Sequence, residues 1–169
     1  QILVEHGDGQ KPIWITEVGW PNDTGGSSEV WATKMLPRAY LLALACGVKN
    51  IAWYDYHDDG QDPSYLEHNC GLLLYDLTPK PLYFAFRATA TELADMRFEK
   101  EIPAGDWATG LLFASKDGRT AVAWSHRRDT PLAFRVGDMK EIELVDLTGN
   151  VERRPVRDGA LLLALREDA

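Results

Sequence analysis

Apolar residues in the first half of the chain follow two different spacings, which predict alternating strands and helices. Residues 13–20 and 48–56 are short runs rich in β-branched and aromatic side chains. Each run predicts a strand, and we expect the first strand to be buried on both faces. Residues 28–47 and 81–93 carry apolar side chains three and four positions apart, which predicts two helices. The order strand, helix, strand, helix is typical of parallel βα units.

The ends of both predicted helices carry recognisable signals. Ser27 or Ser28 can serve as the N-cap of the first helix, and Gly47 can adopt the left-handed conformation that follows a helix end. Pro37 lies inside this helix and predicts a kink or a break into two pieces, because proline lacks a backbone donor. Pro81 opens the second helix, where the first amide groups have no helical partner anyway.

Beyond residue 94 the pattern changes to short alternating runs. Asp117-Gly118, Gly149-Asn150 and Asp158-Gly159 predict hairpin turns between some of these runs. Their spacing is typical of a small antiparallel β-sandwich. We therefore place a domain boundary near residue 94, between an α/β part (1–94) and an all-β part (95–169). The seven predicted strands are 96–102, 110–115, 120–125, 132–136, 141–145, 151–154 and 160–165.

The α/β part lacks the partners that its two strands need. A parallel sheet requires cover on both faces and pairing at its edges. Either copies of the chain close into a ring, or the chain is the end of a longer protein that supplies the earlier strands. The second alternative is favoured because residues 2–6 predict a helix with no N-cap and no starting methionine before it.

Composition excludes several classes of function. The chain has 169 residues, 45% of them hydrophobic and 26% charged, which is typical of a globular protein with one domain or two small ones. A net charge of −8 argues against a nucleic-acid partner, because phosphate would be repelled. No apolar run approaches the roughly 20 residues of a membrane span, and no signal peptide is recognisable. Two cysteines are too few for a disulfide framework.

Acidic and aromatic residues are concentrated in the α/β part. Residues 1–94 hold 12 acidic and 6 basic side chains together with 12 of the 17 aromatic ones. Such a region suits neutral polyhydroxylated ligands, whose C–H faces stack on rings and whose hydroxyl groups donate to carboxylates. The aromatic residues could equally be ordinary core.

Glu17 is the main candidate for chemistry. It lies near the C-terminal end of the first predicted strand, before a Gly19-Trp20-Pro21 turn. In parallel α/β folds ligands gather at the carboxyl ends of strands, which favours a functional carboxylate. The alternative is a structural glutamate paired with an arginine or lysine of a neighbouring strand.

Four segments resemble the end of the (β/α)₈ TIM barrel of clan GH-A glycoside hydrolases, with the closest similarity to family 39-like and family 5-like members. Residues 11–21, Lys-Pro-Ile-Trp-Ile-Thr-Glu-Val-Gly-Trp-Pro, resemble the seventh barrel strand, and residues 36–48 resemble the seventh helix. Residues 51–58 are similar to the eighth strand, and residues 67–81 to the segment that leads into the eighth helix. The family also attaches a C-terminal β-sandwich, so the resemblance implies a C-terminal βαβα portion of the barrel followed by that domain.

The resemblance implies roles for individual residues. Glu17 matches the catalytic nucleophile, and Trp53 matches the aromatic residue beneath the sugar. Trp20 matches a position that lines the cleft. Asp55 and His57 share the strand phase of Trp53, so we expect them at the barrel interior or its mouth. Core filling remains the alternative for Trp53, because buried tryptophan is most often packing.

The implied reaction is hydrolysis of β-linked sugars by double displacement with retention. It needs a second carboxylic acid about 5 to 5.5 Å from Glu17 as acid and base. In the family this is the glutamate of an Asn-Glu pair, and the chain contains no Asn-Glu dipeptide. The chain alone is therefore expected to be inert, with the missing N-terminal barrel portion, or copies of itself, as partner.

The remaining candidates predict no cofactor and no metal. The acidic run 58–62 lacks the spacing of a calcium loop and is expected to be solvated. His57 and His68 have no further ligand at zinc spacing, but could bind substrate hydroxyl groups. The polar segment 57–69 as a whole predicts no regular structure. A non-catalytic carbohydrate-binding or structural module is the alternative function.

Overall fold

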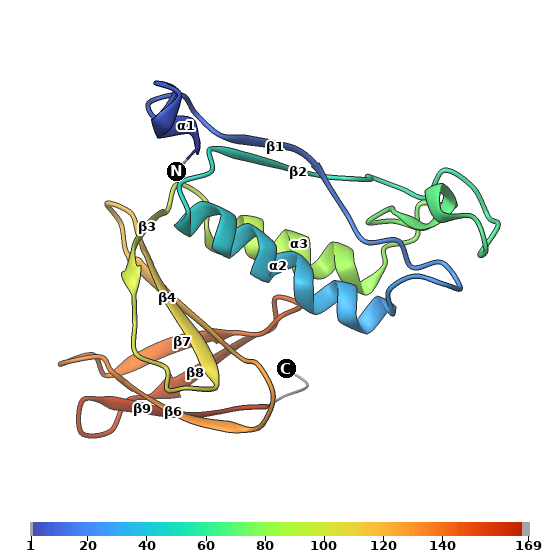
Figure 1. The fold of residues 1–169 in the computed structure, drawn as a ribbon. Coiled ribbons are helices and arrows are strands. Elements are labelled where there is room, and N and C mark those ends of the chain that lie inside the picture. Colours follow the sequence, from blue (N-terminus) through green and yellow to red (C-terminus); the bar gives the residue numbers. More distant parts are fainter. Residues whose placement is uncertain (1, 167–169) are drawn as a thin grey trace.

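The computed structural model describes residues 2–166 and has three layers (Figure 1). The top layer in this view is a pair of strands, β1 (Trp14–Val18) and β2 (Asn50–Trp53). The helices α2 (Glu29–Ala45) and α3 (Pro81–Glu92) form the middle layer, and the antiparallel strands of the C-terminal part lie on their other side. A short helix α1 (Ile2–Glu5) precedes β1.

The β1–β2 pair is parallel, as predicted, but only one of its faces is covered. Ile15 pairs with Ile51 and Val18 with Trp53, with a bulge in β1 between them. Trp14 is 63% exposed and Glu17 is exposed as well. The expected burial on both faces is therefore wrong for residues 2–166. The reason is that, in the described part of the chain, no sheet and no long helix covers the far side of these strands, where Figure 1 shows the short α1 near their left-hand end.

Helix α2 begins and ends where its sequence signals predict. The Ser28 hydroxyl oxygen accepts a hydrogen bond from the Trp31 amide at 3.2 Å, and Gly47 adopts a φ of +84° just beyond the helix. Pro37 lies within the helix without dividing it, so the predicted break is wrong. Proline removes one backbone donor, and the burial of the neighbouring Leu36 and Leu41 in two hydrophobic clusters holds the helix together.

The segment between β2 and α3 is mostly irregular, with one correction to the sequence expectation. A 3₁₀-helix, η1 (Leu66–Asn69), ends the polar segment in which we expected no regular structure. The segment then turns inward at Leu72 and Leu73, which are both buried. Helix α3 follows with Pro81 in its first turn, as predicted.

Between residue 95 and residue 166 the structure has seven strands, all antiparallel, as predicted. They form three hydrogen-bonded sheets, β3-β4-β5, β6-β9 and β7-β8, instead of the two sheets of a simple sandwich. The strands are β3 (Arg97–Glu101), β4 (Ala108–Ala114), β5 (Arg119–Ser125), β6 (Thr130–Arg135), β7 (Glu141–Val145), β8 (Val151–Pro155) and β9 (Ala160–Leu165).

Two hydrophobic clusters organise the core. The helix cluster consists of Ala32, Leu36, Leu72 and Leu82 and joins α2 to α3. The second cluster crosses the predicted boundary near residue 94, because it combines Leu41 of α2 with side chains of β4 and β5, namely Leu111, Phe113 and Trp124. Because the two parts share this cluster, their division into separate domains near residue 94 stays a prediction. Within residues 2–166, none of the helices has the length and apolar character that a membrane crossing requires.

Candidate functional site

The candidate site lies at the carboxyl ends of β1 and β2. Figure 1 shows that the loop with η1 and the first turns of α2 and α3 lie at this same end of the molecule. Glu17 is exposed there, and within residues 2–166 its carboxylate makes no side-chain hydrogen bond or ion pair. The described residues therefore contain no arginine or lysine partner of the kind that the structural alternative requires.

The strand register separates the two faces of the β1–β2 pair. Trp53 packs against the helix cluster, so it lies on the covered face. Val18 is its register partner and shares that face, because paired residues of neighbouring strands point the same way. Side chains alternate along a strand, which places Glu17 and Tyr54 together on the uncovered face. The Tyr54 amide donates to the Val18 carbonyl oxygen at 2.9 Å, so Tyr54 lies one step beyond the last strand pair.

Trp53 belongs to a packed group of tryptophans. Its ring centroid lies 5.4 Å from that of Trp20, which in turn lies 5.4 Å from that of Trp31 in an edge-to-face contact. The Trp53 indole Nε1 donates to the Cys70 carbonyl oxygen at 3.3 Å. Trp20 also packs against the helix cluster. Both tryptophans thus pack on the helix side of the strand ends, and their contact with a sugar stays a prediction.

Tyr54 and Glu67 form a pair that the sequence reasoning missed. The Tyr54 hydroxyl group donates to Glu67 Oε2 at 3.0 Å, and Glu67 comes from η1. This hydrogen bond and the negative charge of Glu67 raise the pKa of Tyr54 to about 12, and Asp59 and Asp55 add to the effect. The alternation of side chains along the second strand could have indicated that Tyr54 lies on the face opposite to Trp53. Nothing in the sequence indicated that η1 would return Glu67 to it.

Replacing Glu67 with glutamine is expected to lower the pKa of Tyr54 from about 12 toward 10, because the anionic acceptor is lost. The contribution of this group to stability is present below pH 10 and is lost as the pH rises through about 12. Ultraviolet titration of tyrosinate measures the change. Burial raises the pKa of Tyr40 to about 12 as well. Its deprotonation at high pH is a second late transition in the titration, and it should remain in Glu67→Gln. Tyr75→Phe is the matched control, and an unchanged late Tyr54 transition in Glu67→Gln would contradict the assignment.

Asp55 and His57, the other predicted site residues, are held by neighbouring backbone. Asp55 Oδ1 accepts a short hydrogen bond from the Tyr56 amide. The His57 ring Nδ1 lies 2.8 Å from the Asp58 carbonyl oxygen. Both residues follow β2 directly and are half-buried. The structure therefore brings them to the strand ends, where their side chains are oriented by local contacts.

A buried ion pair anchors the loop that carries Glu67. Lys80 Nζ lies 2.6 Å from Asp58 Oδ1, and the two side chains are only 4% and 6% exposed. The same Asp58 oxygen accepts the Gly71 amide at 2.9 Å. Asp58 therefore ties the start and the end of the loop to the residue that precedes α3. The sequence treated Asp58 as part of a solvated acidic run, and this is corrected by the structure.

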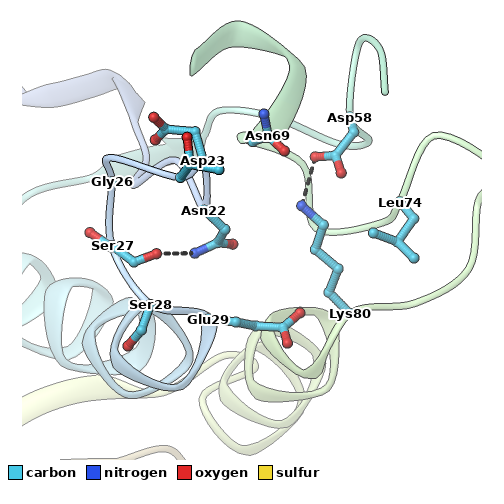
Figure 2. Close-up of a pocket in the computed structure, with 11 residues that line it drawn as sticks. Asn22, Asp23, Gly26, Ser27, Ser28, Glu29, Asp58, Asn69, Leu74 and Lys80 are labelled. Atoms are coloured by element: carbon cyan, nitrogen blue, oxygen red, sulfur yellow. Dashed lines mark hydrogen bonds and ion pairs between the residues drawn. The ribbon is translucent and has the colours of Figure 1, made fainter. Parts of the chain in front are cut away.

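A polar cavity of about 460 Å³ lies beside this ion pair (Figure 2). It is bordered by the first turn of α2 and by the turn before it. Two of its buried oxygens, Asn22 Oδ1 and Asp23 Oδ1, have no hydrogen-bond partner among the described residues. Of the predicted substrate-binding residues, none lines it. Its walls are Asn22, Asp23, Thr24, Gly26, Ser27, Ser28, Glu29, Asp58, Asn69, Leu74 and Lys80.

Metal-binding groups do not converge in the described part of the chain. Across residues 2–166, no three side chains of histidine, cysteine, aspartate or glutamate come together in a way that could hold a metal ion. His68 instead receives the Asp62 amide at its ring Nδ1, at 3.2 Å. Within the acidic run 58–62, Asp58 forms the ion pair with Lys80, whereas Asp62 makes contacts within the loop.

Comparison with known proteins gives a similarity to a solved structure. No protein-family model matches the chain, and no curated protein matches it. Among solved structures, it is similar to a family 39 glycoside hydrolase from the gut symbiont Bacteroides cellulosilyticus WH2, with 30% sequence identity and a TM-score of 0.78. The match covers 92% of this chain and 32% of that chain, so the chain spans about a third of that enzyme. Its fold is thus glycoside hydrolase-like, and the solved structure to which it is similar is a family 39 enzyme.

Proposed function

We propose that the chain is the C-terminal part of a retaining glycoside hydrolase of clan GH-A. In this proposal β1, α2, β2 and α3 are the last two βα units of a TIM barrel, followed by an accessory β-domain. The 30% identity to a family 39 enzyme over 92% of the chain supports it. The observation that carries the catalytic part is the exposed Glu17 carboxylate at the carboxyl end of a parallel strand.

The uncovered face of β1 and β2 supports the presence of a further barrel portion. Trp14 is 63% exposed on a strand of a kind that parallel sheets normally bury. The earlier barrel strands would cover this face and would supply the acid and base residue. A ring of identical chains is the alternative, and sedimentation of the chain distinguishes the two.

The proposed mechanism has two displacements at the anomeric carbon. Glu17 attacks this carbon and forms a glycosyl ester, while the glycosidic C–O bond breaks and the second carboxylic acid protonates the leaving oxygen. The resulting carboxylate then removes a proton from water, which attacks the same carbon and releases Glu17. Two inversions give retention. Because the acid and base residue lies outside the chain, the chain alone would be inactive.

The other predicted residues would shape the cleft around Glu17. Asp55 and His57 follow β2 and would contact sugar hydroxyl groups from its mouth. Trp20 and Trp53 would hold the strand ends in place from the helix side, and Tyr54 is the ring on the face of Glu17.

Trapping the covalent intermediate tests the proposal. The longer polypeptide should be inactivated by 2-deoxy-2-fluoro β-glycosides that carry a dinitrophenyl leaving group, because fluorine slows hydrolysis of the glycosyl ester. Peptide mass spectrometry should locate the label on Glu17. A label on another carboxylate would overturn the assignment of Glu17. Hydrolysis that survives without any label would favour a non-catalytic carbohydrate-binding or structural role for this part of the protein.

A further inference from the structure

The Tyr54–Glu67 pair presents acceptors and no donor to the uncovered face. A phenol has one proton, and that of Tyr54 is directed to Glu67 Oε2. The phenol oxygen keeps a lone pair, and Glu67 Oε1 makes no hydrogen bond within residues 2–166. Glu67 is exposed, so a ligand can reach it. A ligand that binds here must therefore supply the protons.

The segments of the chain that carry this pair and Glu17 contain no lysine or arginine. The sequence has no lysine or arginine between Lys11 and Lys34, or between Lys49 and Lys80. These two intervals contain the strand ends, the turn after β1 and the whole loop with η1. Lys80 is buried and its ammonium group is already paired with Asp58 at 2.6 Å.

Negative charge is concentrated at the same place. Glu67, Asp55 and Asp59 are near enough to Tyr54 to stabilise its protonated form, and Glu17 shares its face. An anionic ligand would meet repulsion here, and within residues 2–166 these segments offer no guanidinium or free ammonium group to offset it. A neutral sugar avoids this cost.

We propose that Tyr54 and Glu67 form a recognition site for neighbouring hydroxyl groups of a neutral sugar, and that the residues which this chain places at the strand ends disfavour glycosides that carry a carboxylate. The proposal rests on the proposed function and specifies its substrate class. One sugar hydroxyl donates to the Tyr54 oxygen and the adjacent one to Glu67 Oε1. Because Glu67 Oε1 belongs to the same carboxylate as the Oε2 atom that accepts from Tyr54, the two acceptors lie close enough together to suit vicinal hydroxyl groups.

Matched pairs of sugars test this in the longer polypeptide. Methyl β-glucoside is compared with methyl β-glucuronide, and methyl β-galactoside with methyl β-galacturonide, by ligand-detected nuclear magnetic resonance titration at pH 7. Within each pair the sugars differ only at carbon 6. We expect at least one neutral sugar to bind at least about tenfold more tightly than its acidic counterpart. The difference should shrink in 0.5 M NaCl, because salt screens the repulsion.

Variants assign the effect to the pair. Glu67→Gln should reduce the preference for the neutral sugar by about threefold, since it removes one negative charge. Tyr54→Phe should weaken binding of the neutral sugar by about fivefold, since it removes an acceptor. Both residues are on the surface side of the fold, so their replacement leaves the core intact. Glu143→Gln, at an exposed position of β7, and Tyr75→Phe are matched controls and should change neither value.

Equal or tighter binding of the acidic sugars, or an unchanged preference in Glu67→Gln, would overturn the recognition site. Failure of every neutral sugar to bind would do so too. Because binding requires no hydrolysis, these results are independent of the trapping experiment. Labelled Glu17 together with tight glucuronide binding would leave the proposed function standing and reject only the inference. Selective binding of neutral sugars without any label on Glu17 would leave the recognition site standing and reject the assignment of Glu17 as nucleophile.

Discussion

Glu17→Gln is expected to lower hydrolysis of β-glycosides by the longer polypeptide at least about a thousandfold, while binding of substrate changes little. The amide of glutamine has nearly the shape of the carboxylate but cannot form the glycosyl ester. The exposed position of Glu17 makes a loss of stability small, because within residues 2–166 no hydrogen bond or ion pair is broken. Steady-state kinetics should therefore show a fall in kcat, and the thermal midpoint should stay within a few degrees.

Rescue by azide separates a nucleophile from a residue that only shapes the cleft. In Glu17→Ala the side chain leaves room for azide, which attacks the anomeric carbon as the dinitrophenolate leaves. A single displacement on a β-glycoside gives the α-glycosyl azide, whereas the wild-type route retains configuration. Glu143→Gln serves as the control, because it removes an exposed carboxylate of the same kind in β7. Wild-type activity in Glu17→Gln, or a β-configured azide product, would contradict the nucleophile assignment.

Lys80→Met is expected to lower the free energy of unfolding by about 3–5 kcal/mol. The change leaves the Asp58 carboxylate buried with the Gly71 amide as its remaining partner. A buried charge without its counterion is costly, because it has lost water without gaining a compensating contact. Chemical denaturation of the 169-residue chain, followed by circular dichroism, measures the difference.

A double-mutant cycle tests whether the cost comes from the unpaired charge. Asp58→Asn combined with Lys80→Met should be much less destabilising than the sum of the single changes, since neither charge then remains. Lys11→Met is the matched control. Lys11 makes an ion pair of 2.7 Å with Asp8, but these side chains are 71% and 39% exposed, so the loss should stay below about 1 kcal/mol. Similar losses for Lys80→Met and Lys11→Met would contradict the role given to burial.

The ion pair also connects stability to the site. Asp58 and Lys80 hold both ends of the loop whose 3₁₀-helix carries Glu67. We expect Lys80→Met to loosen the contact between Glu67 and Tyr54. The pKa of Tyr54 should then fall from about 12 toward 10, in addition to the loss of stability. In this way a residue before α3 would influence recognition at the far end of β2.

Local sequence determined the elements of this protein and their order. The N-cap at Ser28, the glycine after α2 and the proline in the first turn of α3 act within a few residues of their own position, so they could be recognised directly. The seven strands after residue 94 followed from alternation and turn residues in the same way. The position of Glu17 near the end of a parallel strand could also be predicted, because this required only the location and the direction of that strand.

The tertiary structure decided which face of the strands the helices cover. It thereby also decided which side chains lie beside Glu17. Alternation along β2 separates Trp53 from Tyr54, but both are aromatic, so the pattern cannot say which one packs against α2 and α3. The contacts of Tyr54 with Glu67 and of Lys80 with Asp58 join residues 13 and 22 positions apart. Such contacts depend on how an irregular loop returns to the strand ends, which side-chain periodicity does not encode. The position of Glu17 at the end of a strand could thus be predicted from its neighbours in the chain, whereas its neighbours in space came only from packing.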